Sequence, residues 1–537
     1  MCIRDSNITT HTIGLNLDLP WLDNIASAGG GGYYSVATTD QLLAAFESIV
    51  SSAFDTATTF VSPAVTIDQF SRLSHRDDTY LALFQPTTSV RWPGNLKRYN
   101  FSGKPPTIRD QNGVSVLDTS TGIFKDNSHS YWSESPDGNM ITSGGAASQL
   151  DIATRIVATY TGDGTNYLTD ARNLVHEDNA ATLGTWINAQ GDELATVLAW
   201  ARGVDVDDED ADGSTSDTRN QMGDPMHSSP TILTYGGTST DPDSVVFVGT
   251  NEGYLHAFNS EDGKELFAFI PPELLGNLPT FYQNSPGTVR PYGLDGALTL
   301  WIDDKNRNDI VDSGSDQAYL YAGMRRGGKN YYALDVTEKS NPKYLWTISG
   351  GQGTDFAELG QTWSKPVKTK IKLDDQNRDV LIFGGGYDTT QDTATSRTAD
   401  KVGNTLFIVD ALDGSLLWKA SSDSNSDYSQ MMYSMPSDPR VLDVNGDGLA
   451  DQIYIGDMGG QIWRFDVSNN GGSATQLITG GVIADLADAK SENNRRFFYP
   501  PDLSLIEEEG YIYLSVAIGS GNRTPTGQNC GRSFLYD

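Results

Sequence analysis

The second half of this chain repeats one short pattern, and this repetition restricts the possible folds more than any other feature of the sequence. In each copy an alternating strand is followed by a glycine-containing turn and a second alternating strand. The four clearest copies are Val245–Phe258, Ala318–Leu334, Leu381–Val409 and Gln452–Phe465. A polar residue follows each copy: Asn259, Asp335, Asp410 or Asp466. The pattern predicts a series of antiparallel sheets built alike.

Further strands flank each copy, so that the repeating unit contains four strands. Two copies continue through an Asp-Gly turn, at Asp262-Gly263 and Asp413-Gly414, into an aromatic strand. Four strands at a spacing of roughly 65 to 70 residues predict the blades of a β-propeller, with a sandwich of coincidental hairpins as the alternative. Because one blade cannot bury both of its faces, aromatic residues are expected to pack between neighbouring blades. These residues are Phe258, Tyr332, Phe407 and Trp463.

The rest of the sequence divides the chain into three regions. Residues 1–55 read as strand, helix, strand, helix, which predicts the end of a parallel α/β sheet; the second helix is expected at Gln41–Ala53. Residues 56–225 are predicted to be a β-rich and helical connecting region that contributes an early blade, with its clearest helix at Asp192–Arg202. Residues 226–537 are predicted to form the propeller blades. The predicted fold class is therefore mainly β.

Composition and charge exclude one large class of function. The 537 residues carry a formal net charge of −33, and such a surface would repel the phosphates of nucleic acids. No apolar run long enough for a transmembrane helix is present, and the two cysteines, Cys2 and Cys530, cannot form a disulfide framework. We interpret Met1–Ser6 as a sequencing-adapter remnant and Ser533–Asp537 as an interrupted strand. The chain is therefore expected to be an internal fragment that lacks its signal peptide.

One nine-residue run has the composition of a calcium-binding loop. Residues 443–451 read D-V-N-G-D-G-L-A-D, and Gly448 stands where an EF-hand loop turns. Oxygen ligands are predicted from the side chains of Asp443, Asn445, Asp447 and Asp451 and from the carbonyl of Leu449. The flanks predict strands, and Tyr454 replaces the bidentate glutamate of an EF-hand. The run therefore predicts a Ca²⁺ loop between two strands, with an Asp/Gly-rich surface turn as the alternative.

Two other runs resemble this loop less closely. Asp208–Asp212 begin a D-E-D-A-D-G sequence, but position 9 is Ser216, and a solvated acidic loop is an equally good interpretation. Asp304–Asp312 have the spacing, but Asp309 replaces the turn glycine. No catalytic site is predicted, because His227 has no evident acidic partner, and neither G-x-S-x-G nor H-E-x-x-H occurs.

Six phrases together resemble the PilY1/PilC family, the calcium-binding tip adhesins and assembly factors of bacterial type IV pili. They are R-W-P-G-N-L-K-R-Y from 91, A-R-G-V-D-V from 201, G-D-P-M-H-S-S-P from 223, V-G-T-N-E-G-Y-L-H-A-F from 248, the calcium loop with I-G-D-M-G-G-Q-I-W-R-F-D from 455, and G-S-G-N-R from 519. In addition, residues 29–50 resemble the last strand and helix of a von Willebrand factor A domain, whose D-x-S-x-S metal loop is missing here.

The resemblance implies a fold, a function and partners. The fold would be a quinoprotein-like β-propeller preceded by the tail of a von Willebrand factor A-like domain. The protein would be non-enzymatic and would lie at the cell surface, outer membrane or pilus tip. Ca²⁺ on Asp443, Asn445, Asp447, Leu449 and Asp451 would regulate pilus extension and retraction and surface attachment. Its partners would be minor pilins and a host or abiotic surface, although the integrin-binding R-G-D of some relatives is absent.

A dehydrogenase that uses pyrroloquinoline quinone is the alternative function, because such quinoproteins share the blade repeat. They bind the quinone with Ca²⁺ on the propeller axis, often beneath a ring formed by adjacent cysteines. This chain has no adjacent cysteines, and its predicted calcium ligands lie in one loop instead of several blades. The residues therefore favour the non-enzymatic function.

Overall fold

The computed structural model describes two units of the chain, within residues 1–59 and 60–537. The described residues are 10–15, 20–28, 30–38, 41, 45, 60–67 and 75–521, except 105, 119–123, 239–241, 425, 475–476, 489, 491–492 and 509–510. Most of the predicted helix Gln41–Ala53 lies outside these residues, as do both cysteines and the segments Met1–Ser6 and Ser533–Asp537.

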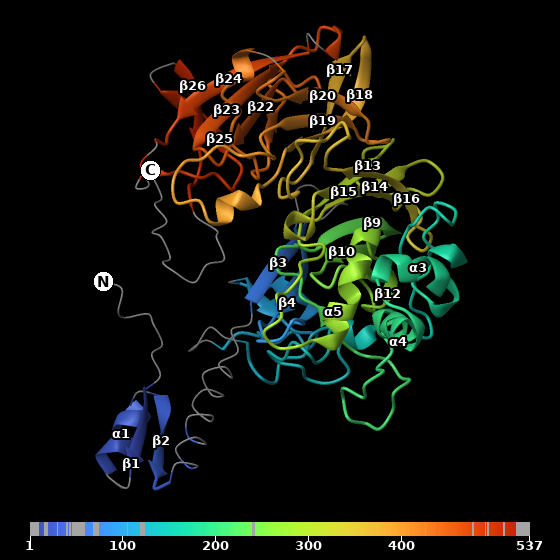
Figure 1. Ribbon diagram of the computed structural model, residues 1–537, viewed down its shortest axis with the longest axis vertical. Coiled ribbons are helices and arrows are strands. Elements are labelled where there is room, and N and C mark those ends of the chain that lie inside the picture. Colours follow the sequence, from blue (N-terminus) through green and yellow to red (C-terminus); the bar gives the residue numbers. More distant parts are fainter. Residues whose placement is uncertain are drawn as a thin grey trace. The chain divides into compact units, whose positions relative to one another are not determined.

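The first unit contains a parallel strand pair. β1 (Thr10–Leu15) is followed by α1 (Pro20–Ala28) and β2 (Gly30–Val36) (Figure 1). β1 and β2 pair in parallel, because the helix returns the chain to the start of the sheet. The strand, helix and strand predicted here are confirmed. The likeness to a von Willebrand factor A domain stays a prediction.

The second unit is a series of antiparallel sheets, coloured from blue to red in Figure 1. The first sheet contains β3 (Phe60–Ile67), β4 (His75–Phe84), β5 (Pro93–Ser102) and β6 (Thr107–Arg109), and β8 (Met222–Gly223) pairs with β5. The second contains β9 (Thr231–Gly237), β10 (Pro242–Gly249), β11 (Leu255–Asn259) and β12 (Glu265–Phe269), extended by β7 (Val157–Ala158) parallel to β12.

The remaining sheets repeat the same order of strands. The third contains β13 (Leu298–Asp303), β14 (Gln317–Gly323), β15 (Asn330–Asp335) and β16 (Lys343–Ser349). The fourth contains β17 (Val367–Leu373), β18 (Gln376–Gly384), β19 (Leu406–Asp410) and β20 (Leu416–Ala420). The fifth contains β21 (Arg440–Leu442), β22 (Gln452–Gly456), β23 (Gln461–Val467) and β24 (Ile478–Asp485), and β25 (Asp502–Glu508) pairs with β26 (Tyr511–Ala517). This arrangement confirms the predicted β-propeller with four-stranded blades.

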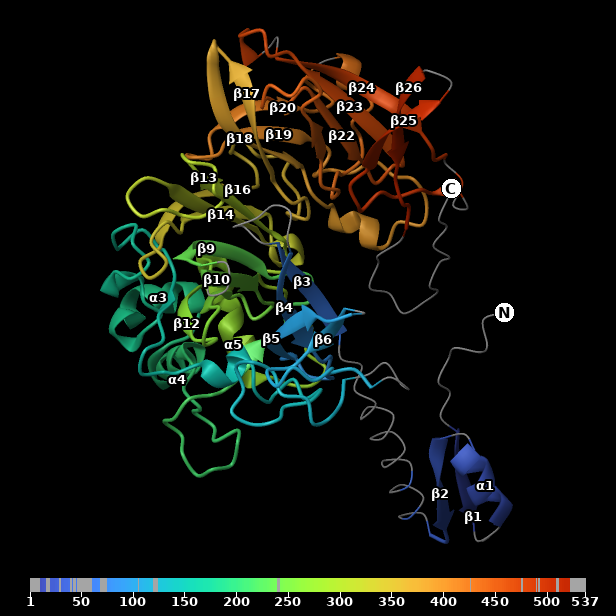
Figure 2. The same ribbon diagram turned by 180° about the vertical axis from the view of Figure 1, so that it is seen from behind.

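Hydrophobic side chains join each of the first four sheets to the next. The aromatic residues predicted to lie between blades are all buried, with Phe258, Phe407 and Trp463 at 0% and Tyr332 at 2% exposure. Trp463, for example, belongs to a core cluster that contains residues of both the fourth and the fifth sheets, which lie side by side in Figure 2. Burial of one such ring stabilises the fold by about 2 kcal/mol, so the blade interfaces supply much of the driving force for folding.

The Asp-Gly turns are fixed by tryptophans. Gly263 has φ 75° and Gly414 has φ 73°, a left-handed backbone that favours glycine. A Cβ atom at Gly263 would lie 2.6 Å from the ring of Trp132, and one at Gly414 would lie 2.8 Å from the ring of Trp346. The repeated Asp-Gly is therefore required both by the turn and by the ring that covers it.

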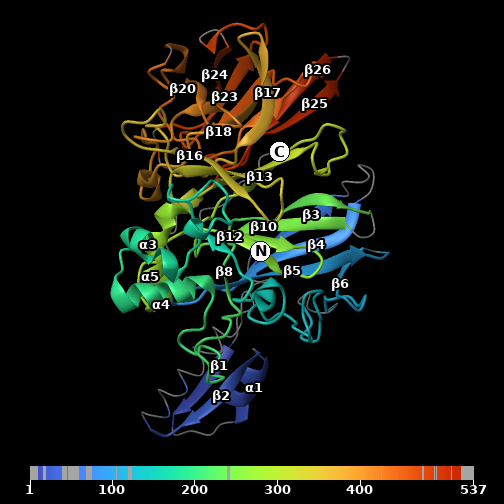
Figure 3. The ribbon, with the colours of Figure 1, turned by 90° about the vertical axis from the view of Figure 1, so that its right-hand side faces the viewer.

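Three helices pack beside the second sheet, where Figure 3 shows them next to β12. They are α3 (Ala180–Ile187), α4 (Gly191–Arg202) and α5 (Leu278–Gln283), the last preceded by a 3-10 helix, η4 (Pro272–Asn277). α4 confirms the helix predicted at Asp192–Arg202, and it buries Leu194, Val197 and Trp200 against this core. Among the described residues, no helix has the length and apolar character needed to cross a bilayer.

Candidate functional site

The predicted calcium loop, residues 443–451, joins β21 to β22 in the fifth sheet. The two strands pair in register, with Leu442 opposite Gln452, so that the loop closes a short hairpin. Residues 443–448 are exposed, whereas Ala450 is completely buried. One end of the loop is thus anchored in the core and the other reaches solvent, where a cation could enter.

The side chains at positions 1, 3 and 5 turn into the loop. Asp443 Oδ1 accepts hydrogen bonds from the N–H groups of Gly446 (2.7 Å) and Asp447 (3.2 Å), and its Oδ2 accepts one from Gly448 (2.8 Å). Asn445 Oδ1 accepts from Asp447 N (2.8 Å), and Asp447 Oδ1 accepts from Leu449 N (2.8 Å). The loop therefore wraps around its own oxygen side chains.

Glycine is favoured at two positions of this loop. Gly446 has φ 79° and Gly448 has φ 85°, and no atom lies within 4 Å of a Cβ built on either residue. The preference is therefore one of backbone conformation, because steric space is available at both positions.

Asp451 closes the loop at position 9. Its Oδ2 accepts hydrogen bonds from the N–H groups of Val444 (2.8 Å) and Asn445 (3.3 Å), so that both ends of the loop meet on one carboxylate. Its Oδ1 faces the amide of Asn469, whose Nδ2 lies 3.4 Å away and also donates to Ala450 O (2.9 Å). Asn469 therefore positions this carboxylate from outside the nine-residue motif.

Asn469 also links the loop to the neighbouring blade. Its Oδ1 accepts a hydrogen bond from Lys372 N (3.0 Å) in β17, and Ala450 N donates to Lys370 O (2.8 Å) in the same strand. Any change in the position of Asp451 would thus alter the contacts at an interface between blades. The sequence gives no signal for Asn469, which stands among other polar residues after β23.

The donor set of this loop suits a hard divalent cation. Three carboxylates, one amide oxygen and the carbonyl of Leu449 are oxygen ligands of the kind that Ca²⁺ takes, and the loop contains no basic side chain. The structure does not gather the carboxylates of Asp443, Asp447 and Asp451 as closely as those of another loop, described next.

The closest group of carboxylates in the described part of the chain belongs to Asp208, Asp210 and Asp212, whose oxygens lie within 4.8 Å of one another. This loop has the same internal hydrogen bonds, from Gly213 N to Asp208 (3.0 Å) and from Asp212 N to Asp210 (3.2 Å). Ser216 at position 9 is exposed, as are Asp210 and Asp212. The structure therefore brings these three predicted candidates together, but in an open, solvated loop.

His227 has an acidic partner that the sequence did not reveal. Its Nδ1 lies 2.8 Å from Asp295, which is 1% exposed and also accepts from Arg325 Nη1 (3.0 Å). Burial opposes ionisation of Asp295, but His227 and Arg325 together lower its pKa. The guanidinium of Arg325 in turn lies 3.9 Å from the ring centre of Trp363. The expectation that His227 lacks an acidic partner was therefore wrong, because Asp295 is 68 residues away in sequence.

His256 lies in a buried ion-pair cluster. Its Nδ1 lies 2.6 Å from Glu265, and its ring stacks between those of Tyr254 and Phe258. Burial raises the pKa of Glu265, but the ion pairs with Arg155 and His256 outweigh this effect and lower the pKa to about 2. Because both side chains of the pair are only 2% exposed, the cluster is structural.

Comparisons with known proteins concern the same region. Residues 217–477, which include the calcium loop, match the family described as the PilY1 beta-propeller domain. The type IV pilus biogenesis factor PilY1 of Pseudomonas aeruginosa strain UCBPP-PA14 is 27% identical over 507 residues, covering 84% of this chain and 37% of the relative. A PilY1 homolog of Xylella fastidiosa strain Temecula1 is 33% identical over 232 residues, covering 42% of this chain and 14% of the relative.

A solved structure is also similar to this chain. The C-terminal domain of Pseudomonas aeruginosa PilY1 is 27% identical, with a TM-score of 0.36 over 52% of this chain and 53% of that domain. The chain thus spans little more than a third of the length of the Pseudomonas aeruginosa relatives, which are larger proteins.

Proposed function

Because this chain belongs to the PilY1 family through its β-propeller domain, we propose that it is part of a type IV pilus biogenesis factor whose propeller binds Ca²⁺. The ligands would be the side-chain oxygens of Asp443, Asn445, Asp447 and Asp451 and the carbonyl of Leu449. The role is non-enzymatic: ion occupancy regulates pilus extension and retraction and attachment to a surface. The protein acts at the cell surface or pilus tip, with minor pilins as partners.

The inward turn of Asp443, Asn445 and Asp447 supports the calcium proposal most directly. Their oxygens are already held by backbone N–H groups, so binding would cost little ordering of the loop. The ion neutralises three clustered negative charges and removes their repulsion. Through Asn469 and Ala450, the loop then tightens against Lys372 and Lys370 of the neighbouring blade.

Calorimetric titration with CaCl₂ tests the site. We expect the chain to bind Ca²⁺ with a Kd between about 10⁻⁷ and 10⁻³ M, and Asp451→Ala to remove this binding, because both ends of the loop meet on that carboxylate. Asp312→Ala, at the same position of the Asp304–Asp312 loop, is the matched control and should leave the affinity unchanged. Equal affinity of the Asp451→Ala variant and the parent chain would contradict the assignment, provided that circular dichroism shows both folded.

The pilus role is tested in cells. The full-length protein, with or without Asp451→Ala, is expressed in a type IV piliated bacterium that lacks its own homologue. We expect the unaltered protein to restore surface pili and twitching motility, and the variant to restore pili but to respond differently to calcium. Failure of the unaltered protein to restore pili would refute the biogenesis role, whereas identical calcium responses would refute only the regulatory one.

A further inference from the structure

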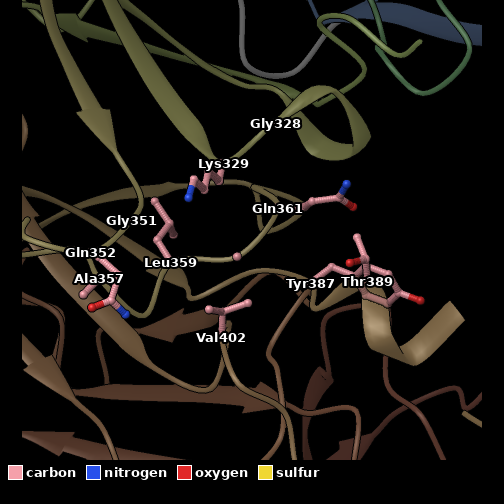
Figure 4. Close-up of a pocket in the computed structure, with 11 residues that line it drawn as sticks. Gly328, Lys329, Gly351, Gln352, Ala357, Leu359, Gln361, Tyr387, Thr389 and Val402 are labelled. Atoms are coloured by element: carbon pink, nitrogen blue, oxygen red, sulfur yellow. The ribbon is translucent and has the colours of Figure 1, made fainter.

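A cavity of about 340 Å³ lies between the third and fourth sheets. Its lining residues precede β15, β17 and β19 or follow β16 and β18 (Figure 4). In an antiparallel blade these connections lie at the end of the sheet opposite to the loop between the first two strands. The cavity is therefore at the other end of the blades from loops such as 443–451, and its lining contains none of the proposed calcium ligands.

Lys329 is the only charged residue among those that line this cavity. In the described part of the chain no carboxylate lies within 4.0 Å of its amine, whereas Lys343 and Lys419 pair with Asp335 and Glu358. Lys329 is exposed, and none of the residues that line the cavity is acidic. A negatively charged ligand would supply the missing partner.

The wall beside Lys329 is shaped to leave room for its amine. Gly351 has φ 139°, and a Cβ atom there would lie 3.1 Å from Lys329 Nζ. Another residue there would strain the backbone, and the flexible end of the Lys329 side chain would have to shift by a few tenths of an ångström. In Figure 4 the amine extends from the upper wall towards Leu359.

The rest of the wall is mostly apolar and rigid. Leu359 and Tyr387 are each 1% exposed, and the Tyr387 ring is stacked on Trp363 at 4.4 Å. The Tyr387 hydroxyl donates to Asp392 (2.8 Å), so it is not available to a ligand. Gln352 and Thr389 are exposed at the rim and can donate hydrogen bonds. The cavity thus offers one cation, an apolar wall and a polar rim.

We propose that this cavity binds a carboxylate carried on a short apolar stem. The carboxylate pairs with the Lys329 ammonium, and the stem packs against Leu359 and Val402. A volume of about 340 Å³ lies at the lower end of the range for small-molecule sites, which restricts the stem to a few carbon atoms. Such a group occurs both in free short-chain acids and at the C-terminus of a peptide that ends in an apolar residue.

Ligand-observed NMR titration tests the proposal with two acids, hexanoate and N-acetyl-alanyl-leucine, each beside its neutral amide. We expect at least one acid to bind and its amide to bind more weakly. Lys329→Gln should weaken binding of the acid about fivefold, because it removes a solvent-exposed ion pair but keeps an unbranched polar side chain. Lys104→Gln, at an exposed lysine in the turn between β5 and β6, is the matched control and should change nothing.

The two acids also distinguish the sources of the carboxylate. Tighter binding of hexanoate assigns the cavity to free acids, and tighter binding of the dipeptide assigns it to a chain end. The proposal is overturned if neither acid binds the parent chain at ~10 mM, an affinity weaker than that of ordinary small-molecule sites. It is equally overturned if Lys329→Gln binds the acids as well as the parent chain does.

Discussion

The loops 304–312 and 443–451 occupy the same place in two different blades. Comparing them distinguishes the features that the backbone conformation produces by itself from those that a bound ion would add. Each joins the first strand of its sheet to the second. At position 8 of each loop a backbone N–H donates to the first strand of the preceding sheet, from Val311 to Thr234 O (2.9 Å) and from Ala450 to Lys370 O (2.8 Å). The blade interface therefore fixes both loops in the same way.

The internal hydrogen bonds of the two loops also correspond. Asp304 accepts from the N–H groups of Arg307 (2.5 Å) and Asp309 (2.7 Å), as Asp443 accepts from those of Gly446 and Gly448 at the same positions. Positions 4 and 6 have left-handed backbones in both loops, at Arg307 (φ 62°) and Asp309 (φ 60°) in the first and at two glycines in the second. The conformation therefore does not require the glycines, although glycine adopts it at the lowest cost.

The centres of the two loops differ in charge. In the 304–312 loop the amide nitrogens of Asn306 and Asn308 donate to Asp312 Oδ2, at 2.6 and 2.9 Å. Two neutral amides thus take the place that a cation would have and satisfy the closing carboxylate. In the 443–451 loop position 5 is the carboxylate Asp447, which cannot donate. The comparison predicts that the number of carboxylates at positions 1, 5 and 9 decides whether a loop with this backbone binds an ion.

The largest expected effect is the loss of calcium-dependent stabilisation. Calcium at 100 times its Kd should stabilise the chain by about 2.7 kcal/mol if it binds only the folded state. Asp443→Asn should remove this gain, whereas Asp304→Asn should preserve it. Thermal unfolding with Ca²⁺ and with a chelator measures both. Loss of the calcium effect in the Asp304→Asn variant would show that the two loops share the ion-binding role.

Exchanging the residue at position 5 between the two loops should partly exchange their calcium affinities. Asp447→Asn removes one of three negative charges, and we expect it to weaken calcium binding about tenfold. Asn308→Asp should create measurable calcium binding in the other loop, because it adds a third carboxylate at a ligand position and removes an amide that occupies the centre. Calorimetry on the two single variants and the double variant gives the stoichiometry. A stoichiometry of one calcium ion in every variant would contradict the role assigned to position 5.

The positioning role of Asn469 should produce a smaller loss. Asn469→Ala removes the amide that faces Asp451 and contacts Lys372, and we expect calcium affinity to fall about fivefold. Asn470→Ala is the matched control, since its side chain accepts only a hydrogen bond from Gly472 N (3.0 Å). The Asn469→Ala variant should also lose thermal stability in the absence of calcium, because the contact with β17 is structural. An effect on stability alone would restrict Asn469 to that structural role.

The smallest effects should come from position 6. Gly448→Ala places a Cβ in a left-handed backbone and should lower the free energy of unfolding without calcium by about 1 kcal/mol. Asp309→Gly relieves the corresponding strain and should raise the free energy of unfolding by less than about 1 kcal/mol, because a more flexible unfolded chain offsets part of the gain. Urea denaturation of the two variants measures the sign of each change in the free energy of unfolding. Equal changes in the same direction would show that the two loops differ in backbone conformation.

Most of the fold could be predicted from the sequence. Alternation of apolar residues predicted the paired strands of the blades, and the rings of Phe258, Tyr332, Phe407 and Trp463 were predicted to lie between sheets because one blade cannot bury both faces. The nine residues of the calcium loop could also be recognised, because ligands contributed by neighbouring residues leave a local spacing. Local hydrogen bonds and strand periodicity are properties of adjacent residues, so the sequence by itself determined them.

Only the tertiary structure decided which distant residues meet. Asp295 lies 68 residues from His227, and Asn469 lies 97 residues from Lys372, so neither contact leaves a pattern in the sequence. The cavity beside Lys329 likewise combines the loops of two sheets. These features arise where blades stack. Stacking depends on the combined packing of many side chains from distant parts of the chain, so it leaves no short local pattern in the sequence. The amide closure of the 304–312 loop depends in the same way on where two side chains point in the folded blade.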